Sequence, residues 1–219
     1  MSPPSDVFLA KLGDLLSALT RQRGPLLVAL VGANGAGKTT FYQRCLAGVG
    51  LPFVNADELG RALVQAGASA GESTERLAAD LADKRRQDLL SKRESFITET
   101  VFSDPVGEKV ALLRDAGARG YLVVLIFVCV DSAELTALRV QSRVKDGGHD
   151  VPPDRIRTRY ERMRGNVRSA VSFVDLAVLV DNSSFETPLV PVAVTAKGKV
   201  IHQRAPLPWW AEAVLPRNG

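Results

Sequence analysis

The chain alternates short apolar runs with longer segments in which apolar residues recur at helical spacing. Five runs are too short for buried helices and end at glycine, proline or polar residues, a pattern typical of strands buried on both faces. These runs are Leu26–Val31, Pro52–Asn55, Ser95–Thr98, Tyr121–Val130 and Leu176–Val180. Between them lie the helix-length segments Lys38–Ala47, Glu72–Lys92, Val106–Ala116 and Ala133–Lys145. This alternation predicts an α/β fold with three layers around a five-stranded, mainly parallel sheet.

The two ends of the chain extend this pattern. Apolar residues at helical spacing follow Ser5, so we expect an amphipathic helix within residues 1–24. Near the other end, two short runs flank the turn at Lys197-Gly198 and predict a β-hairpin within residues 187–219. Because no Gly/Ser-rich linker or internal repeat interrupts the chain, we expect residues 1–219 to form a single domain.

Composition narrows the class of protein. With 46% hydrophobic and 24% charged residues, the chain of 219 residues has the composition of an ordinary globular domain. The start of the chain has no basic and apolar signal pattern, and the apolar run at Tyr121–Val130 is too short to span a bilayer. We therefore expect a cytoplasmic protein with no membrane partner. Its two cysteines, Cys45 and Cys129, have no metal-ligand spacing and are expected to be buried, reduced thiols.

The strongest motif is the stretch Gly32–Thr39, GANGAGKT, which matches the P-loop pattern between a predicted strand and a predicted helix. Glycines let the backbone N–H groups wrap phosphate oxygens, Lys38 reaches the β and γ phosphates, and Thr39 is the predicted Mg²⁺ ligand. ATP and Mg²⁺ are therefore the expected cofactors. The predicted nucleotide-binding residues are Gly32, Ala33, Asn34, Gly35, Ala36, Gly37, Lys38, Thr39 and Thr40.

Two carboxylates follow later strands, at the edge of the sheet where ligands bind. Asp57 is predicted to act as a base that takes a proton from an attacking hydroxyl, and Glu99 to accept hydrogen bonds from a polyhydroxy substrate. Each has a structural alternative: Asp57 could cap a helix that begins near Glu58, and Glu99 could pair with a cation such as Arg86. The predicted substrate-binding residues are Asn55, Asp57, Glu99, Thr100 and Ser103.

Positive charge gathers in residues 139–168, which hold nine Lys or Arg against four Asp or Glu. Helical spacing on both sides of Gly147-Gly148 predicts a helix, a hinge and a second helix, and hence a basic lid. An arginine on such a lid could stabilise the charge of a transferring phosphoryl group, and Arg139 and Arg143 are the candidates for catalysis beside Lys38 and Asp57. Aromatic residues do not cluster beside these arginines, which argues against nucleic acid as a partner.

Other residues of the second lid helix divide between two faces. Arg162 and Asn166 share a face that can reach inward toward the sheet, whereas Arg157 and Arg164 are expected on the solvent-facing surface. Tyr160 falls at core spacing and is expected to pack. The pair Trp209-Trp210 is interpreted mainly as packing of the C-terminal tail, with a partner surface as the alternative.

Together these segments resemble the zeta toxin family, in particular its short, single-domain branch. The motifs that carry the resemblance are GANGAGKTT, FVNADELG, SFITETVFS, RVQSRVKDGGHDVPPDRIRTRYERMRGN and VDLAVLVDNS. The resemblance implies a kinase-like fold and transfer of phosphate from ATP, with Mg²⁺, to a sugar hydroxyl of UDP-N-acetylglucosamine or a related UDP-sugar. It also implies an antitoxin protein as a partner.

Position by position, the resemblance assigns the nucleotide lysine to Lys38, the Mg²⁺ ligand to Thr39, the base to Asp57 and a substrate-binding role to Glu99. Better-known members carry a threonine where this chain has Val101, beside Thr100. His149 stands near the place of one lid arginine. The residues Asp181-Asn182-Ser183 fit the end of the last strand in the short branch, beside the adenine or the lid.

Two other functions fit the same P-loop. One is a kinase that acts on a 5′-hydroxyl polynucleotide end or on another small metabolite, in which the basic lid holds the acceptor. The other is a regulatory module that binds ATP without turnover.

Overall fold

The computed structural model describes residues 11–19, 24–144 and 153–216, with side chains given outside 140–144 and 153–156. Its seven strands form one sheet in the order β2-β3-β1-β4-β5-β6-β7. The strands are β1 Leu26–Val31, β2 Phe53–Asn55, β3 Phe96–Thr100, β4 Leu122–Cys129, β5 Leu176–Asp181, β6 Val190–Ala196 and β7 Lys199–Gln203.

The first five strands are parallel to one another, which confirms the predicted parallel sheet. The predicted hairpin exists as β6 and β7, but it is not a separate appendage. Because β6 pairs antiparallel with β5, the hairpin continues the same sheet, and the count of five strands was too low. Each residue of β1 is buried, as expected for a central strand covered on both faces.

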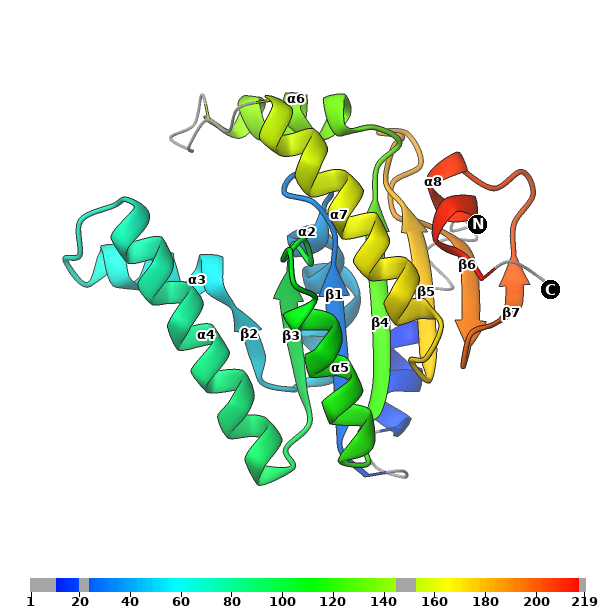
Figure 1. The fold of residues 1–219 in the computed structure, drawn as a ribbon, viewed down its shortest axis with the longest axis horizontal. Coiled ribbons are helices and arrows are strands. Elements are labelled where there is room, and N and C mark those ends of the chain that lie inside the picture. Colours follow the sequence, from blue (N-terminus) through cyan, green and yellow to red (C-terminus); the bar gives the residue numbers. More distant parts are fainter. Residues whose placement is uncertain (1–10, 20–23, 145–152, 217–219) are drawn as a thin grey trace.

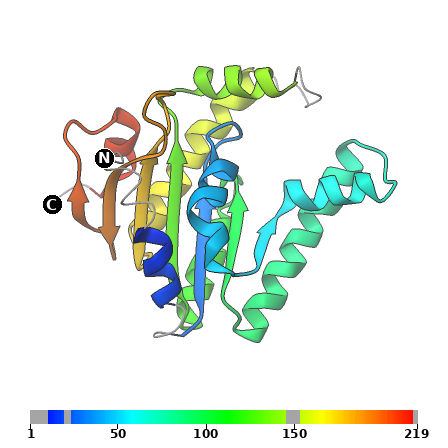
Figure 2. The same ribbon diagram turned by 180° about the vertical axis from the view of Figure 1, so that it is seen from behind.

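Helices cover both faces of the sheet. Figure 1 shows α5 and α7 in front of the central strands. Figure 2, the view from behind, shows the helix at residues 11–19 together with α2 and η1 on the opposite face of the sheet. The helical elements between and after the strands are α2 Lys38–Phe41, η1 Tyr42–Leu46, η2 Ala47–Val49, α3 Ala56–Gln65, α4 Glu72–Lys92, α5 Glu108–Ala118, α6 Ala133–Val144, α7 Pro153–Val171 and α8 Trp209–Val214. The predicted three-layer arrangement is thus confirmed.

The predicted helix that begins at Lys38 changes its character along its length. It starts as the α-helical turn α2, continues as the π-helix η1 and ends as the 3-10 helix η2 before Gly50. Helix α6 leaves the carboxyl end of β4 and crosses above the sheet, so that the predicted lid lies at the same edge as the P-loop (Figure 1). The hinge predicted at Gly147-Gly148 and the neighbouring His149 lie outside the described residues.

The tail packs onto the domain as the sequence suggested. Trp210 on α8 is fully buried and meets the ring of Phe127 edge-on, with 5.4 Å between the ring centroids. Trp209 is about half exposed and donates its indole N–H to the carbonyl of Asp131 over 2.9 Å. Both cysteines are buried and neither forms a disulfide, as predicted, and Tyr160 is buried in the core.

Truncation of Trp210 is expected to be costly because it empties a large volume between α8 and the sheet. We expect Trp210→Ala to lower the free energy of unfolding by about 3–5 kcal/mol, measured by urea denaturation. Ile201→Ala, which truncates an exposed apolar residue of β7, serves as the control and is expected to change it by less than about 0.5 kcal/mol. Equal effects of the two changes would contradict this packing.

Candidate active site

The P-loop follows β1 directly and ends at α2, as predicted. Gly32, Gly35 and Gly37 have φ angles of 155°, 80° and 100°. A Cβ atom on Gly32 would lie 2.2 Å from the carbonyl oxygen of Val128, so only glycine fits there. This glycine-dependent path gives the loop the shape that can wrap a phosphate group with backbone N–H groups.

The predicted nucleotide-binding residues differ in their exposure. Asn34 and Thr40 are exposed, Gly35, Gly37 and Thr39 are half-buried, and Gly32, Ala33, Ala36 and Lys38 are buried. Lys38 is the first residue of α2 and donates from Nζ to the carbonyl oxygen of Ala33 over 3.2 Å. Its Nζ also lies 3.6 Å from Oε1 of Glu99. The side chain of Lys38 therefore joins the P-loop to β3.

Glu99 lies within β3, one position beyond the predicted strand, and is buried with only 7% of its surface exposed. The parallel register places it beside Asn55 of β2, whose Nδ2 donates to Oε2 of Glu99 over 3.2 Å. The alternative that Glu99 pairs with Arg86 is wrong. Arg86 instead pairs with Asp83 and donates to the hydroxyl of Thr98.

Asn55 also caps a helix, a role that the sequence suggested for Asp57. Its Oδ1 accepts a hydrogen bond of 2.8 Å from the backbone N–H of Asp57, so Asn55 is the N-cap of α3. The alternative that Asp57 itself caps this helix is therefore wrong. Asp57 lies in the first turn of α3, and its side chain is exposed and available to a substrate.

The electrostatics link these residues into one site. Burial raises the pKa of Glu99 above its ordinary value, the ammonium of Lys38 lowers it in part, and the negative charge of Asp57 raises it again. The charge of Asp57 thus reaches Glu99 at the edge next to the P-loop. Glu99 is buried and paired with Lys38, whereas Asp57 is open to solvent.

The loop after β3 is held by α7. Thr100 accepts a hydrogen bond of 3.3 Å from the N–H of Phe102, and the carbonyl of Ser103 accepts one of 3.4 Å from Arg162. Asn166 donates from Nδ2 to the carbonyls of both Phe102 and Asp104, each over 3.1 Å. The inward face predicted for Arg162 and Asn166 is confirmed.

The prediction that Arg157 and Arg164 face solvent is correct for Arg157 and wrong for Arg164. Arg157 is exposed and pairs with Glu134 over 2.9 Å. The side chain of Arg164 is only 18% exposed, because its guanidinium lies over the ring of Trp209, 4.5 Å from the centroid. Arg164, which the helical spacing assigned to the surface, therefore forms a contact between α7 and α8.

Of the two lid arginines, the structure describes the side chain of Arg139. Its guanidinium donates to the carbonyl of Ser183 over 3.4 Å and lies 4.8 Å from the ring centroid of Phe185. Burial lowers the pKa of Arg139, while the charge of Asp181 raises it. Arg143 belongs to α6, but its side chain lies outside the described residues.

The sequence analysis did not select Asn182 as a site residue. Its side-chain amide donates to the carbonyl of Ala36 in the P-loop over 2.7 Å, although 146 positions separate the two residues. The sequence held two signals for it, which were its place directly after the last parallel strand and the resemblance of Asp181-Asn182-Ser183 to the strand end that lies beside the adenine or the lid.

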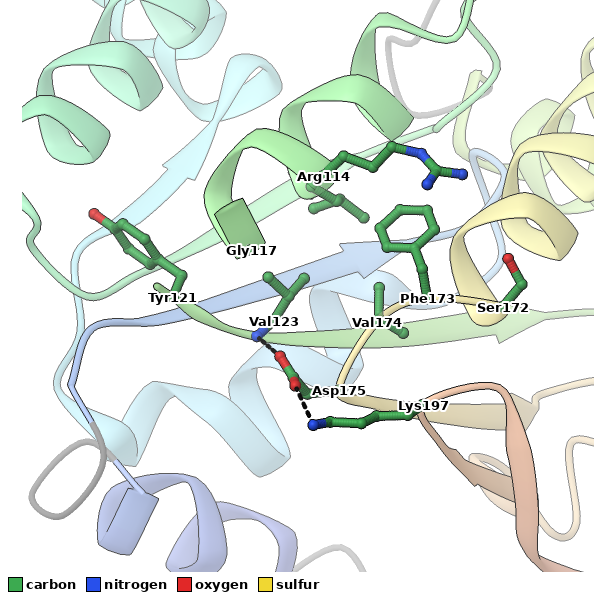
Figure 3. A pocket seen from close by; sticks show the side chains of 10 residues that line it. Arg114, Gly117, Tyr121, Val123, Ser172, Phe173, Val174, Asp175 and Lys197 are labelled. Carbon is green, nitrogen blue, oxygen red and sulfur yellow. Dashed lines mark hydrogen bonds and ion pairs between the residues drawn. The ribbon is translucent and has the colours of Figure 1, made fainter. Parts of the chain in front are cut away.

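A pocket of about 510 Å³ lies far from the P-loop, at the opposite edge of the parallel strands (Figure 3). It is lined by residues of α5, β4 and the connections around β5, and its charged groups already contact neighbours. Asp175 accepts from the N–H of Val123 and lies 4.0 Å from Nζ of Lys197, and the guanidinium of Arg114 covers the ring of Phe173. None of the predicted site residues lines this pocket.

Within the described ranges, no cluster of three or more His, Cys, Asp or Glu side chains is placed to bind a metal ion. The hydroxyl of Thr39, half-buried at the start of α2, suits a magnesium ion that takes its other ligands from phosphates and water. None of the helices in the described part of the chain is long and apolar enough to cross a membrane.

The family is decided by comparison with known sequence families. The model of the family described as zeta toxin matches residues 10–186, which include the P-loop, both carboxylates and the basic segment. The chain belongs to the zeta toxin family. A search of curated proteins gave no match.

Solved structures similar to this zeta toxin family member show the same fold. A complex of AvrRxo1-ORF1 and AvrRxo1-ORF2 with sulphate ions is 20% identical, with a TM-score of 0.65 over 98% of this chain and 70% of that chain. A structure of the same two proteins with ATP is 19% identical, with a TM-score of 0.59 over 98% and 69%. The PezAT toxin–antitoxin system of Streptococcus pneumoniae is 17% identical, with a TM-score of 0.56 over 87% and 82%. Family membership and the P-loop fold together support an ATP-dependent phosphotransferase.

The raised pKa of Glu99 has a consequence for stability. A carboxyl group whose pKa rises on folding binds more protons in the native state than in the unfolded state, so the free energy of unfolding falls as pH rises through that interval. Glutamine does not titrate, so we expect the free energy of unfolding of Glu99→Gln to lack this fall with pH. The stability difference, wild type minus variant, should fall as pH rises from the ordinary glutamate pKa to the raised one.

Urea denaturation at several pH values measures this difference. Asp88→Asn is the control, because a hydrogen bond from Lys92 holds the pKa of Asp88 below its ordinary value and gives the opposite sign. A difference for Glu99→Gln that stays constant or grows with pH would contradict the buried environment of this carboxylate.

Proposed function

We propose that this chain is an ATP-dependent kinase that phosphorylates a hydroxyl of a UDP-activated amino sugar, of the UDP-N-acetylglucosamine type. The observation that carries the proposal is the contact between Lys38 of the P-loop and Glu99, which lies beside Asn55 and acts electrostatically with Asp57. A phosphate-binding group and acceptor-binding carboxylates therefore adjoin one another. Such an arrangement suits transfer of a phosphoryl group from one ligand to the other.

In this proposal each residue has a distinct role. The P-loop backbone and Lys38 hold the phosphates of ATP, and Thr39 contributes a ligand to Mg²⁺, which neutralises charge on the phosphates when it is bound. Glu99 and Asn55 orient the acceptor through hydrogen bonds to its hydroxyl groups. Thr100 and Ser103 lie in the loop that would border the sugar.

Asp57 is proposed as the base. The acceptor oxygen forms a bond to the γ-phosphorus, the bond from that phosphorus to the ADP oxygen breaks, and the hydroxyl proton passes to the carboxylate of Asp57. The exposed position of Asp57 in the first turn of α3 supports this role, because an entering hydroxyl can reach it. Glu99 suits the role less well, since Lys38 and Asn55 already occupy its oxygens.

The partners follow from the family. Two of the solved relatives are complexes or systems of paired proteins, and one of them is named a toxin–antitoxin system. We propose that an antitoxin protein binds this chain and covers the nucleotide site. The nature of the UDP-sugar rests on the family resemblance and on the hydroxyl-binding carboxylates.

The test of the function is an acceptor screen with site variants. We expect the wild-type protein, with ATP and Mg²⁺, to add one phosphate to a UDP-amino sugar, detected by mass. Asp57→Asn is expected to lower this turnover by about 10²–10⁴-fold while nucleotide binding persists, because only proton removal is lost. Glu58→Gln, the neighbouring exposed carboxylate in the same helical turn, is the matched control and should retain turnover.

The outcomes separate the competing functions. Phosphorylation of a 5′-hydroxyl oligonucleotide and not of UDP-sugars would make the chain a polynucleotide kinase. ATP binding without any acceptor product would make it a binding module. Full turnover by Asp57→Asn would leave the kinase but remove Asp57 as its base.

The lid arginines form a separate prediction. We propose that Arg139 and Arg143 stabilise the charge of the transferring phosphoryl group, a role in which arginine fingers raise turnover by about 10³–10⁵-fold in other phosphotransferases. Arg139 contacts Ser183 and Phe185 in the connection from β5 to β6, at the edge of the sheet from which the P-loop emerges.

Steady-state rates of single alanine variants test this role. Arg139→Ala and Arg143→Ala are each expected to lower kcat by at least about tenfold, if the charge-stabilising role is divided between them. Arg157→Ala, an exposed arginine of the same basic segment that pairs with Glu134, is the control and should keep the wild-type rate. Equal rates for all three variants would remove the lid arginines from the mechanism.

A further inference from the structure

Asn182 is held in place by the sheet. It follows the last residue of β5, and its backbone N–H donates to the carbonyl of Cys129 over 2.8 Å, which extends the pairing of β4 and β5 by one step. Its side chain therefore leaves a rigid position at the carboxyl edge of the sheet. This is the edge from which the P-loop also emerges.

Both polar atoms of the Asn182 side chain form hydrogen bonds. Nδ2 donates to the carbonyl oxygen of Ala36 over 2.7 Å, and Oδ1 accepts from the backbone N–H of Leu189 over 3.1 Å. Ala36 and Leu189 are both fully buried, and Leu189 has a φ of 56°, which is rare for a leucine. One side chain thus connects the P-loop to the segment that leads into β6.

The contact is close enough to restrict the sequence of the P-loop. A Cβ atom on Gly37 would lie 2.3 Å from Nδ2 of Asn182, and Gly37 also has a φ of 100°. Glycine at this position is therefore favoured by its backbone angle, and any larger residue would also force the Asn182 amide to move. The P-loop and Asn182 fit each other as a pair.

The hydrogen bond to Ala36 also sets the direction of a neighbouring donor. A trans peptide is planar, and its C=O and N–H groups point in opposite directions. Since the carbonyl of Ala36 points at Asn182, the N–H of Gly37 in the same peptide must point away from it. In a P-loop, donors of this kind bind phosphate oxygens, and a peptide that rotated would offer the phosphates a carbonyl oxygen instead.

We propose that Asn182 is a positioning residue for the nucleotide, which locks the Ala36–Gly37 peptide so that the Gly37 N–H faces the phosphates. This rests on the proposed binding of ATP by the P-loop. Asn182 acts through the loop and does not touch the reacting atoms. Its effect therefore falls on the affinity for nucleotide and leaves the affinity for the acceptor unchanged.

The decisive variant is Asn182→Asp, which keeps the shape but removes the donor. A carboxylate repels the carbonyl of Ala36 and adds negative charge near the phosphates, so the Kd for ATP is expected to rise by at least about tenfold. Asn182→Ala removes the donor without adding charge, and a rise of about three- to tenfold is expected. Each Kd is measured by calorimetry on folded protein, with the unfolding midpoint recorded beside it.

A matched control separates this role from simple loss of structure. Ser184 lies in the same connection, and its hydroxyl accepts hydrogen bonds from the N–H groups of Glu186 and Thr187, with none to the P-loop. Ser184→Ala should lower the unfolding midpoint without changing the Kd for ATP. If Asn182 had only a structural role, Ser184→Ala and Asn182→Ala would behave alike.

Lower pH provides a further readout. When the introduced carboxyl of Asn182→Asp is protonated, it regains an O–H donor for Ala36. Its Kd for ATP, divided by the wild-type Kd at the same pH, is therefore expected to fall as pH falls through the carboxyl range. Kinetics should show a raised KM for ATP and an unchanged KM for the acceptor.

The possible outcomes are distinct. A wild-type protein that binds ATP, together with an Asn182→Asp variant that binds it equally well, would overturn the inference and leave the proposed function standing. A wild-type protein that binds no nucleotide would overturn the proposed function and the inference with it. If Asn182→Asp does not fold, the comparison between Asn182→Ala and Ser184→Ala decides the question.

Discussion

The site depends on the pairing of two buried charges, the ammonium of Lys38 and the carboxylate of Glu99. A charged group that is buried away from water needs a partner of opposite charge. Here the Nζ of Lys38 and the Oε1 of Glu99 are partners, 3.6 Å apart. The pair can form because β1 and β3 are neighbours in the sheet, so that Lys38 of the P-loop, which follows β1, meets Glu99 near the end of β3. The order of the strands is therefore what brings the P-loop and Glu99 together.

The same pair explains why the structure around it is so constrained. The second oxygen of Glu99 is satisfied by Asn55, and Asn55 uses its other end to cap α3. Helix α3 in turn carries Asp57 in its first turn, at a position set by that cap. One ion pair and two hydrogen bonds thus connect Lys38 of the P-loop to the backbone N–H of Asp57, the proposed base.

Much of this could be predicted from the sequence. The apolar runs identified all five parallel strands, because a central strand leaves a continuous apolar signal, and the pattern of Gly32–Thr39 identified the P-loop. Glu99 was selected from its place at the end of a strand. The roles of Lys38 and Thr39 came from the P-loop pattern and that of Asp57 from its place after a strand, and the family resemblance assigned the same roles. Their catalytic parts stay predictions.

What could not be predicted depends on contacts between distant segments. Glu99 has Asn55 as its neighbour because of the register between β2 and β3, and the hydrophobic pattern of a sequence does not reveal which residues of two strands lie side by side. The pairing of Arg86 with Asp83 was likewise not visible in that pattern. The hairpin was found, but whether it joins the sheet depends on the exposed edge of β5. Arg164 looked like a surface residue because the position of α8 over it is not encoded in the spacing of α7.

Helix α7 connects parts of the molecule that catalysis would need to coordinate. Arg162 and Asn166 hold the loop after β3, Tyr160 donates to the carbonyl of Val130 at the end of β4, and Arg164 rests on Trp209. The basic lid predicted from the sequence, residues 139–168, includes most of this helix. A change in the tilt of α7 would therefore move the loop after β3 and the contact with Trp209 together.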